Sequence, residues 1–337
     1  MERRGRASMR EVAARAGVAM SSVSRVLSDH PDVSPVMRER VQRAVEELEY
    51  KPDLLAQSLR RRQTRSVGFV VGDISNQLLA EIAKGAETAL RDAGYAMLLT
   101  NSEGDPELDA DHVRLFEQRR TDGLILSLAR EDHQPTLDAI EALEAPIVVI
   151  DRELRTSLVV SRVLSDHAHG MHTAVNHLFD LGHRRIGLTL GQPIRPSNER
   201  RRAFEEAHAA RGLEPGPVVA GRLSVDFGVE ATRELLDRAD RPTAIIAGGN
   251  QLMIGALKVF SERELELGRD ISFLGCDDIP VTGLYRPPIA VVRRDNVAIG
   301  RKAAELLLRL MKDGGIATEV VLPTEFVPRA SCAPPGG

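Results

Sequence analysis

From residue 67 onward, apolar runs of strand length alternate with helical patterns. Val67–Val71 is an unbroken apolar run, Leu79–Leu90 has helical periodicity, and strand-like runs follow at Ala96–Thr100, Gly123–Ser127 and Ile147–Ile150. Alternation of this kind predicts an α/β fold in which helices cover both faces of a parallel sheet.

A later stretch of the chain echoes this first strand. Arg65–Val71 resembles Arg185–Leu190. Each is followed by an asparagine near a helix start, a long helix and a glycine turn, at Asn76 and Gly94 and at Asn198 and Gly212. Two similar α/β lobes are the simplest explanation. Such doubly wound lobes bind ligands in the crevice at the carboxyl ends of their strands.

Length and composition limit the class of protein. A chain of 337 residues is too long for one typical domain, so we expect two or three compact units. It has no uncharged apolar run of about 18 residues and no N-terminal apolar segment before a cleavage site, so we expect neither a membrane span nor secretion by that route. The two cysteines, Cys276 and Cys332, have no metal-binding spacing and suit a reducing cytoplasm.

The net charge of −4 hides an asymmetry. Residues 1–66 hold 14 Lys and Arg against 9 Asp and Glu, whereas the remainder holds 31 against 40. A basic head on an acidic body favours a nucleic-acid contact confined to the N-terminal part, although ordinary surface charge is the alternative.

Residues 8–48 have the pattern of three small helices. Ser8 and Glu11 form a capping box, which predicts a helix start, and Gly17 is a natural turn residue after that helix. The next helix is expected over about Met20–Leu27, with Val23, Val26 and Leu27 facing inward. Ser34 followed by Pro35 predicts the start of a third helix, with Ser34 as its N-cap.

This spacing predicts a helix-turn-helix, whose second helix enters the DNA major groove. The outward positions of that helix are Met20, Ser21, Ser22 and Arg25. Arg25 can donate two hydrogen bonds to guanine, which is the commonest specific base contact. The alternative is a set of plain amphipathic helices.

Asp53–Leu59 resembles a helix that is too short to be stable alone in water, since nucleation is costly. We expect it to become helical only against a partner, such as its copy in a dimer held against DNA. Ala56 lies on its apolar side, and Leu59 could wedge between base pairs in the minor groove. Arg60 and Arg61 would contact phosphates. A merely basic linker would explain the arginines but not the apolar residues.

At these residues the chain resembles the LacI/GalR (lactose-repressor) family of bacterial transcription regulators. The resemblance runs from about Met9 to Arg329, and its motifs occur in the family's order at Val12–Leu27, Val33-Ser34, Tyr50-Lys51-Pro52, Ser58-Leu59, Asp73–Asn76, Asp122–Ile125, Leu181–Ile186, Gly275–Asp278 and Pro323-Thr324. There are departures. Ala19 replaces the usual serine, Gln77-Leu78-Leu79 replaces a segment with Pro and aromatics, and Gln251 replaces an Asp.

The resemblance implies a helix-turn-helix headpiece over 1–50 and a hinge helix with a basic linker over 51–66. It implies a periplasmic-binding-protein-like effector-binding and dimerisation domain over 67–330. The N-lobe of this domain would comprise about 67–164 and 294–322, and the C-lobe about 165–293 and 323–330. Residues 331–337 are expected to form a disordered tail.

The resemblance also supplies candidate effector contacts in the cleft between the lobes, at Asn76, Asp151, Arg200, Leu223, Asn250, Asp277 and Arg294. The alternative for the charged and amide groups is a helix cap or an ion pair between the lobes. Leu223 stands where the family has a stacking aromatic, and the chain has no Trp. We therefore expect a polar effector bound by hydrogen bonds and charge, and the family favours a sugar or sugar derivative.

Other chemistry has less support. The stretch from His167 to His172, with His177 and His183, could suggest a metal site, but no cysteine or second carboxylate cluster accompanies it. No G-x-S-x-G elbow and no P-loop occurs, so we expect no enzyme, no cofactor and no metal. We predict a cytoplasmic, nucleoid-associated homodimeric repressor that binds a roughly palindromic double-stranded operator and is controlled by a small effector. The alternative is a cytoplasmic sugar-binding or sugar-modifying protein with a basic arm.

Overall fold

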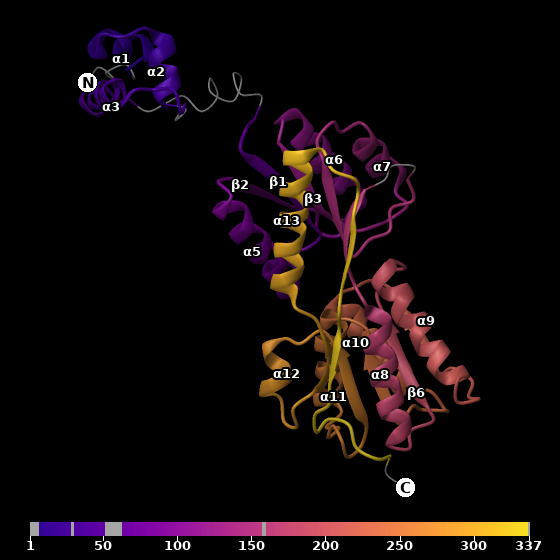
Figure 1. Ribbon diagram of the computed structural model, residues 1–337. Coiled ribbons are helices and arrows are strands. Elements are labelled where there is room, and N and C mark those ends of the chain that lie inside the picture. The colour runs from indigo at the N-terminus through magenta and orange to yellow at the C-terminus, as the bar shows by residue number, and fades with distance from the viewer. Residues whose placement is uncertain (1–6, 28–29, 51–62, 157–159, 336–337) are drawn as a thin grey trace, which may run out of the picture. The chain divides into compact units, whose positions relative to one another are not determined.

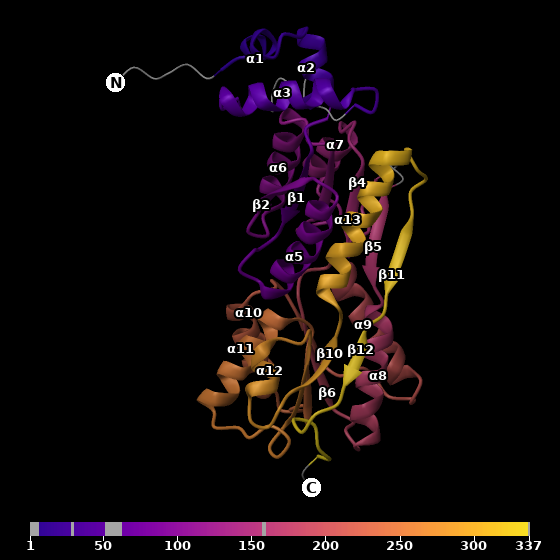
Figure 2. The same cartoon turned by 60° about the vertical axis from the view of Figure 1, so that its left-hand side comes forward.

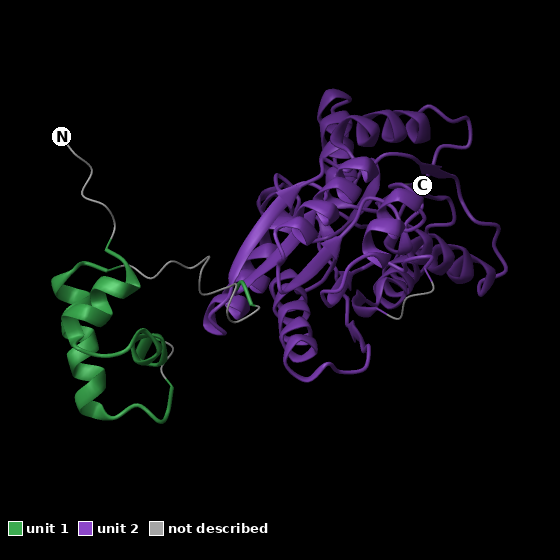
Figure 3. Cartoon of the chain, turned by 90° about the horizontal axis from the view of Figure 1, so that it is seen from above, with its two compact units in different colours: residues 1–64 green, residues 65–337 purple. Residues whose placement is uncertain are grey.

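The computed structural model describes residues 7–27, 30–50, 63–156 and 160–335. The chain divides into two compact units, a headpiece within residues 1–64 and a body within residues 65–337 (Figure 3). Each unit has its own hydrophobic core, and each is described by itself.

The headpiece consists of α1 (Met9–Ala16), α2 (Met20–Leu27) and α3 (Pro35–Glu47). Most of its buried side chains are small because three short helices enclose little volume, and Tyr50 is the exception; the buried residues are Val12, Ala13, Ala16, Val23, Val26, Val41, Ala44 and Tyr50. The predicted capping box of Ser8 and Glu11 is confirmed at the start of α1, and Ser34 caps α3 with Pro35 in the first turn.

The turn between α1 and α2 is held by α3. Gly17 has a left-handed backbone with φ of 63°, a conformation that glycine adopts without the steric cost of a side chain. Nη2 of Arg40 donates hydrogen bonds to the carbonyl oxygens of Ala16, at 2.7 Å, and Gly17, at 3.3 Å. This bracing fixes the direction in which α2 leaves the turn.

The body contains two six-stranded sheets with the same layout. The first has the strand order β11-β5-β4-β3-β1-β2 and is parallel throughout. The second has the order β12-β10-β9-β8-β6-β7 and is parallel except for the β10–β12 pair. β1 and β6 occupy equivalent places, so the repeated strand in the sequence reflects a repeated architecture. The predicted α/β class is confirmed.

We use N-lobe for the first sheet with its helices and C-lobe for the second. The strands of the N-lobe are β1 (Ser66–Val71), β2 (Ala96–Asn101), β3 (Gly123–Ser127), β4 (Ile147–Ile150), β5 (Ser161–Ser165) and β11 (Glu319–Leu322). The strands of the C-lobe are β6 (Ile186–Leu190), β7 (Val218–Ala220), β8 (Ala244–Ala247), β9 (Ser272–Cys276), β10 (Ala290–Arg293) and β12 (Glu325–Val327).

Helices cover both faces of each sheet (Figure 1). In the N-lobe, α5 (Gln77–Asp92) and α13 (Asn296–Asp313) cover one face, and α6 (Pro106–Gln118) and α7 (Gln134–Glu141) cover the other. In the C-lobe the pairs are α8 (His167–Asp180) with α9 (Arg195–Ala209) and α10 (Val225–Leu236) with α11 (Asn250–Glu262). A short helix, α12 (Pro280–Leu284), follows β9.

The backbone passes between the lobes three times. It passes from β5 to α8, from β10 to α13, and from β11 to β12, which Figure 2 shows as two successive yellow strands, one in each lobe. Each connection is only one to two residues long. The lobes are therefore joined by three short connecting segments.

The expectation of a disordered tail is wrong for residues 331–335. The Ser331 hydroxyl is fully buried and donates to the carbonyl of Phe273 at 2.6 Å, while its backbone carbonyl accepts from the Phe273 N–H at 2.9 Å. The Ala333 carbonyl accepts a hydrogen bond from the Ser272 hydroxyl. Composition suggested disorder here, but the backbone of β9 provides hydrogen-bond partners that composition cannot reveal.

Candidate effector cleft and DNA-reading helix

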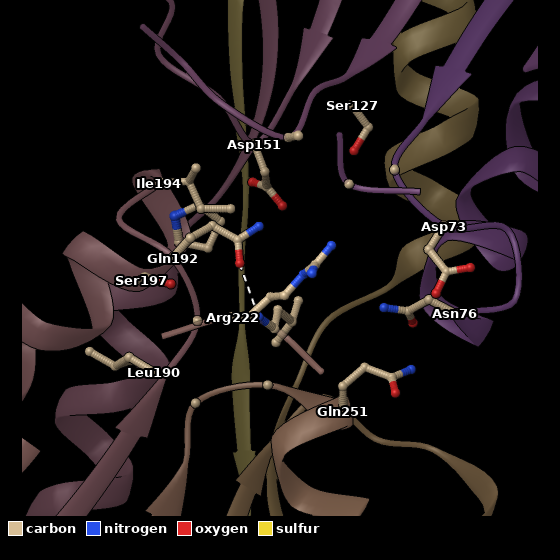
Figure 4. Close-up of a pocket in the computed structure, with 18 of the residues that line it drawn as sticks. Asp73, Asn76, Ser127, Asp151, Leu190, Gln192, Ile194, Ser197, Arg222 and Gln251 are labelled. Carbon is tan, nitrogen blue, oxygen red and sulfur yellow. Dashed lines mark hydrogen bonds between the residues drawn. The ribbon is translucent and has the colours of Figure 1, made fainter. Parts of the chain in front are cut away.

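A cleft of about 940 Å³ lies between the lobes of the body, at the carboxyl ends of the strands. It is lined by segments that follow β1, β2, β3 and β4 in the N-lobe and β6, β7, β8 and β9 in the C-lobe. Figure 4 shows polar side chains from both lobes turned into this space. Its volume suits a small molecule of several polar groups.

Asp151 and Asp277 occupy equivalent positions in the two lobes. Asp151 follows β4, and its N–H donates to the Val163 carbonyl at 2.9 Å; Asp277 follows β9, and its N–H donates to the Val292 carbonyl at 2.8 Å. Both have left-handed backbones, with φ of 48° and 79°. This conformation suits aspartate better than most residues because its short side chain can bond locally, and it turns the carboxylates out of the strand ends.

Arg294 joins these two carboxylates. Its Nη1 donates to Asp151 Oδ2, and its Nε donates to Asp277 Oδ1 at 3.1 Å. Burial alone would lower the pKa of Arg294, but the carboxylates of Asp277 and Asp151 together raise it. The positive charge of the guanidinium is therefore balanced by one carboxylate from each lobe.

Asp151 is held more firmly than its counterpart. Its Oδ1 accepts from the Ser165 N–H at 2.6 Å, and its Oδ2 accepts from the Ser165 hydroxyl at 3.1 Å. Burial would raise the pKa of this carboxyl, but the facing His167, Arg294 and the Ser165 N–H keep it well below its usual range. Asp151 is therefore ionised at neutral pH.

His167 and Arg200 close a ring of contacts around Arg294. Nη2 of Arg200 lies 3.3 Å from His167 Nδ1 and 3.9 Å from Asp277 Oδ1, and His167 Nε2 lies 3.5 Å from Asp151 Oδ2. Burial, followed by the charge of Arg200, lowers the pKa of His167 to about 4. The ring is neutral because His167 is uncharged at neutral pH and the two arginines balance the two aspartates.

Asn76 and Asn250 form a second bridge between the lobes. Asn76 caps α5 in the N-lobe, and Asn250 is the first residue of α11 in the C-lobe. Nδ2 of Asn250 donates to Asn76 Oδ1 at 2.8 Å, and the return hydrogen bond measures 3.5 Å. Both side chains are buried, so each amide satisfies part of the other's hydrogen-bonding capacity.

The structure thus brings six predicted residues into two interlobe clusters, one containing Asp151, Arg200, Asp277 and Arg294 and the other containing Asn76 and Asn250. Leu223 also lines the cleft and packs beside Gly191 and Gly249. Its N–H donates to Gln192 Oε1 at 3.0 Å, as the dashed line in Figure 4 shows.

Sequence reasoning missed several residues that line the cleft or join the lobes beside it. Gln192, Arg222 and Gln251 point into the cleft from three C-lobe segments (Figure 4). Arg195, at the start of α9, binds Glu153 at 3.2 Å across the lobes, and its N–H donates to Glu131 Oε1 at 2.9 Å. His167 belonged to the histidine-rich stretch, but its position directly after β5 was the informative signal.

The exposed side of α2 carries the predicted DNA contacts. Val23 and Val26 are buried as predicted, whereas Ser21 and Arg25 are exposed and Met20 is 50% exposed. Ala19 precedes the helix, and its carbonyl accepts from the N–H groups of Ser22 and Val23. Its methyl side chain leaves the helix start without the oxygen of a typical cap. Ala56, Leu59, Arg60 and Arg61 lie outside the described residues.

Comparison with known proteins identifies this combination of parts. Residues 8–53 match the family described as "Bacterial regulatory proteins, lacI family", and residues 175–332 match the "Periplasmic binding protein-like domain". The HTH-type transcriptional repressor PurR of Haemophilus influenzae (strain PittEE) is 30% identical over 317 residues, which cover 92% of this chain and 93% of that protein. The chain belongs to the LacI family.

Two solved structures are similar over almost the whole chain. The lac repressor dimer bound to operator and the anti-inducer ONPF matches with a TM-score of 0.86 at 25% identity, covering 97% of this chain and 99% of that chain. The complex of the transcriptional regulator CelR with cellobiose matches with a TM-score of 0.73 at 30% identity, covering 97% and 100%. This LacI-family chain is a DNA-binding transcriptional regulator and not an enzyme, which removes the sugar-modifying alternative.

Within residues 7–27, 30–50, 63–156 and 160–335, no helix is long and apolar enough to cross a membrane. The same ranges contain no group of three or more His, Cys, Asp or Glu side chains that could hold a metal ion.

Proposed function

We propose that this LacI-family regulator is a repressor whose affinity for its operator is set by a small polar effector, with a sugar or sugar derivative as the leading class. The observation that supports this most is the interlobe cleft, which gathers hydrogen-bonding groups from both lobes around a space of about 940 Å³. The cellobiose complex of the similar regulator CelR supports the sugar class.

Within the cleft we propose two roles for the predicted residues. Asp151 and Arg294, which pair across the lobes beside the connecting segments, hold the lobes together at that side. Arg200, Leu223, Asn250 and Asp277 contact the effector, and Asn76 contacts it from the N-lobe. The residues of the second group line the cleft, and their polar groups can exchange internal hydrogen bonds for bonds to hydroxyl groups.

In this proposal, effector binding changes how the two lobes are arranged relative to each other. The Asn76–Asn250 bridge is a contact that an effector hydroxyl can replace, and this exchange gives the effector different affinities for two lobe arrangements. In the proposed mechanism, lobe movement shifts the separation of the two hinge segments of a dimer. Asp53–Leu59, which includes Ala56, is proposed to be helical only at the separation that fits operator DNA.

For the DNA contact we propose that α2 enters the major groove. Met20, Ser21, Ser22 and Arg25 would face base edges, and Ser8 and Ser34, at the starts of α1 and α3, would contact phosphates together with Arg60 and Arg61. The exposed face of α2 and the basic charge of residues 1–66 support this arrangement.

We also propose that the protein acts as a homodimer through residues 67–330. The body exposes large apolar side chains that an interface between two copies would bury, including Leu284 at 74%, Ile74 at 40% and Leu98 at 38% exposure. The similar lac repressor structure is a dimer on its operator. A dimer with twofold symmetry requires a roughly palindromic site.

The central test combines DNA binding with ligand screening. The full-length protein should shift the DNA upstream of its own gene in a gel assay, and Arg25→Ala should relax the base preference of that binding. A thermal-shift screen of sugars, polyols and their derivatives should find a compound that stabilises the protein and changes the gel shift. Stabilisation by purines or metal ions only would contradict the proposed effector class.

A further inference from the structure

We propose that the effector carries an anionic group, a carboxylate or a phosphate on a polyhydroxylated small molecule, and that Arg222 is the residue that binds it. This inference rests on the proposed function, because it assigns a chemical class to the ligand of the same cleft. Arg222 belongs to neither of the two clusters that join the lobes.

Arg222 lies in the loop between β7 and α10, next to Leu223. Figure 4 shows its side chain extending into the space between the lobes, with Gln251 below it and Asp151 above. Within the described ranges, its guanidinium has no hydrogen-bond or ion-pair partner in the protein. An arginine in this position can receive a ligand without first breaking an internal contact.

The other arginines at the floor of the cleft differ from Arg222. Arg294 and Arg200 belong to the neutral ring with Asp151 and Asp277, and Arg200 also donates to the Gly248 carbonyl at 2.8 Å. Their charges are therefore already balanced. Arg222 adds a positive charge that this ring does not neutralise.

Besides Asp151 and Asp277, three acidic side chains line the cleft and are the internal competitors for Arg222: Asp73, Glu103 and Asp226. Asp73 accepts hydrogen bonds from the Ser75 N–H at 2.9 Å and the Ser75 hydroxyl at 2.6 Å. Asp226 lies in the first turn of α10, where the helix dipole stabilises its negative charge. These two carboxylates thus have local stabilisation that does not depend on Arg222, and Glu103 lies on the N-lobe loop that follows β2.

Two residues close to Arg222 favour an anion as well. Gln251 points its neutral amide into the cleft near Arg222 (Figure 4), whereas a carboxylate at this position would offer Arg222 a partner inside the protein. Leu223 also lines the cleft and offers a sugar ring no planar aromatic surface, so more of the binding free energy must come from charge and hydrogen bonds.

A guanidinium binds carboxylate and phosphate oxygens through two parallel hydrogen bonds, which are stronger than bonds between neutral groups. The hydroxyl groups of the same ligand would be left for Asn76, Asn250 and Asp277. A sugar acid and a sugar phosphate share this chemistry, and the experiment below separates them.

The test uses matched sets of probes on the full-length protein. Each set contains a neutral sugar, its acid and its phosphate, for example glucose, gluconate and glucose 6-phosphate, with equivalent sets built on ribose and galactose. Thermal shift identifies binders, and calorimetry measures Kd. We expect at least one acid or phosphate to stabilise the protein more than its parent sugar. Which of the two does so identifies the anion.

Variants then assign the effect to Arg222. Arg222→Gln should weaken binding of the anionic probe about ten- to hundredfold, as expected for the loss of a charge-assisted pair, and Arg222→Lys should retain part of it. Gln251→Asp should also weaken anion binding by supplying an internal partner. Arg202→Gln, which alters exposed ion pairs of α9 with Glu199 and Glu206, is the matched control and should leave Kd unchanged.

Two results would overturn the inference. One is a panel in which no acid or phosphate stabilises the protein more than its parent sugar; the other is an anionic ligand that binds the Arg222→Gln variant as well as the wild type. If neutral sugars bind and alter the gel shift, the proposed function stands while the anionic effector is rejected. If only purines or metal ions bind, both proposals fail.

Discussion

The two lobes of the body share one strand order but contribute differently to the cleft. Asp151 and Asp277 follow equivalent strands, with equivalent backbone hydrogen bonds and left-handed conformations. The bonded partners are Val163 and Val292. Two residues beyond them, however, Ser165 ends β5, whereas Arg294 lies in the connection between β10 and α13. The repeated fold therefore supplies two carboxylates and only one arginine, which both carboxylates share.

This difference shows how a repeated fold can form a site that is specific for one ligand. Both lobes have an aspartate at the equivalent strand end, whereas the segments after β6, β7 and β8 of the C-lobe carry Gln192, Arg222 and Gln251. We therefore expect framework substitutions to affect stability and loop substitutions to affect ligand choice.

The largest effect is expected when Arg294, the arginine that both carboxylates share, is replaced. Arg294→Met would leave the carboxylates of Asp151 and Asp277 buried without their common partner, and breaking a buried pair in this way costs about 3–5 kcal/mol. The neighbouring Arg293 pairs with Glu325 on the surface, so Arg293→Met is the matched control and should cost less than about 1 kcal/mol. Chemical denaturation measures both losses. Equal losses would show that Arg294 does not hold the lobes together.

The second test uses pH and concerns the N-lobe side of the ring. The folded-state pKa of His167, about 4, lies below its ordinary value of 6.5, so the unfolded chain binds this proton first as the pH falls. The part of the unfolding free energy that comes from the neutral His167 is therefore present above pH 6.5. It is lost progressively as the pH falls toward 4, by about 3 kcal/mol in total, at about 1.4 kcal/mol per pKa unit.

The variant His167→Gln should remove this pH-dependent contribution to the unfolding free energy. The difference in unfolding free energy between wild type and variant should therefore change by about 3 kcal/mol between pH 7 and pH 4. A constant difference across this window would mean that His167 is not held neutral by its surroundings.

The smallest expected effect compares the two aspartates directly. Asparagine keeps the shape and tolerates the left-handed backbone, so Asp151→Asn and Asp277→Asn remove the charge and replace one acceptor oxygen with an NH2 donor. Asp151 accepts from Ser165 twice and from Arg294, whereas the hydrogen bond to Asp277 comes from Arg294. We expect Asp151→Asn to lose about 1–2 kcal/mol more unfolding free energy than Asp277→Asn. An equal or reversed order would contradict the stronger anchoring of the N-lobe.

Much of the architecture was predictable because buried parallel strands are continuous apolar runs. Val67–Val71, Gly123–Ser127 and Ile147–Ile150 coincide with β1, β3 and β4 to within one residue. By contrast, β7 has only three residues, and β11 and β12 are partly exposed, so their sequences carry weak apolar patterns. Their pairing depends on neighbouring strands that are distant in sequence.

The candidate site was predictable where a residue is fixed by the framework. Asp151, Asp277 and Arg294 stand at strand ends, and the family resemblance pointed to each of them. Arg222 and Gln192 lie in loops without periodicity, so only the folded chain shows that they face the cleft. The buried Ser331 was mispredicted for a related reason, since its partners on β9 lie about 58 positions earlier in the chain.

The three connections between the lobes also constrain how the protein is made. The N-lobe core includes Ile299, Ala303 and Leu307 of α13, and its sheet ends with β11, yet both segments follow almost the entire C-lobe in the sequence. A chain emerging from the ribosome can complete the contiguous headpiece early, as is usual for N-terminal domains. It cannot finish its first lobe until most of the second has been synthesised. The two lobes must therefore mature together during biosynthesis, whereas the headpiece does not have to wait for them.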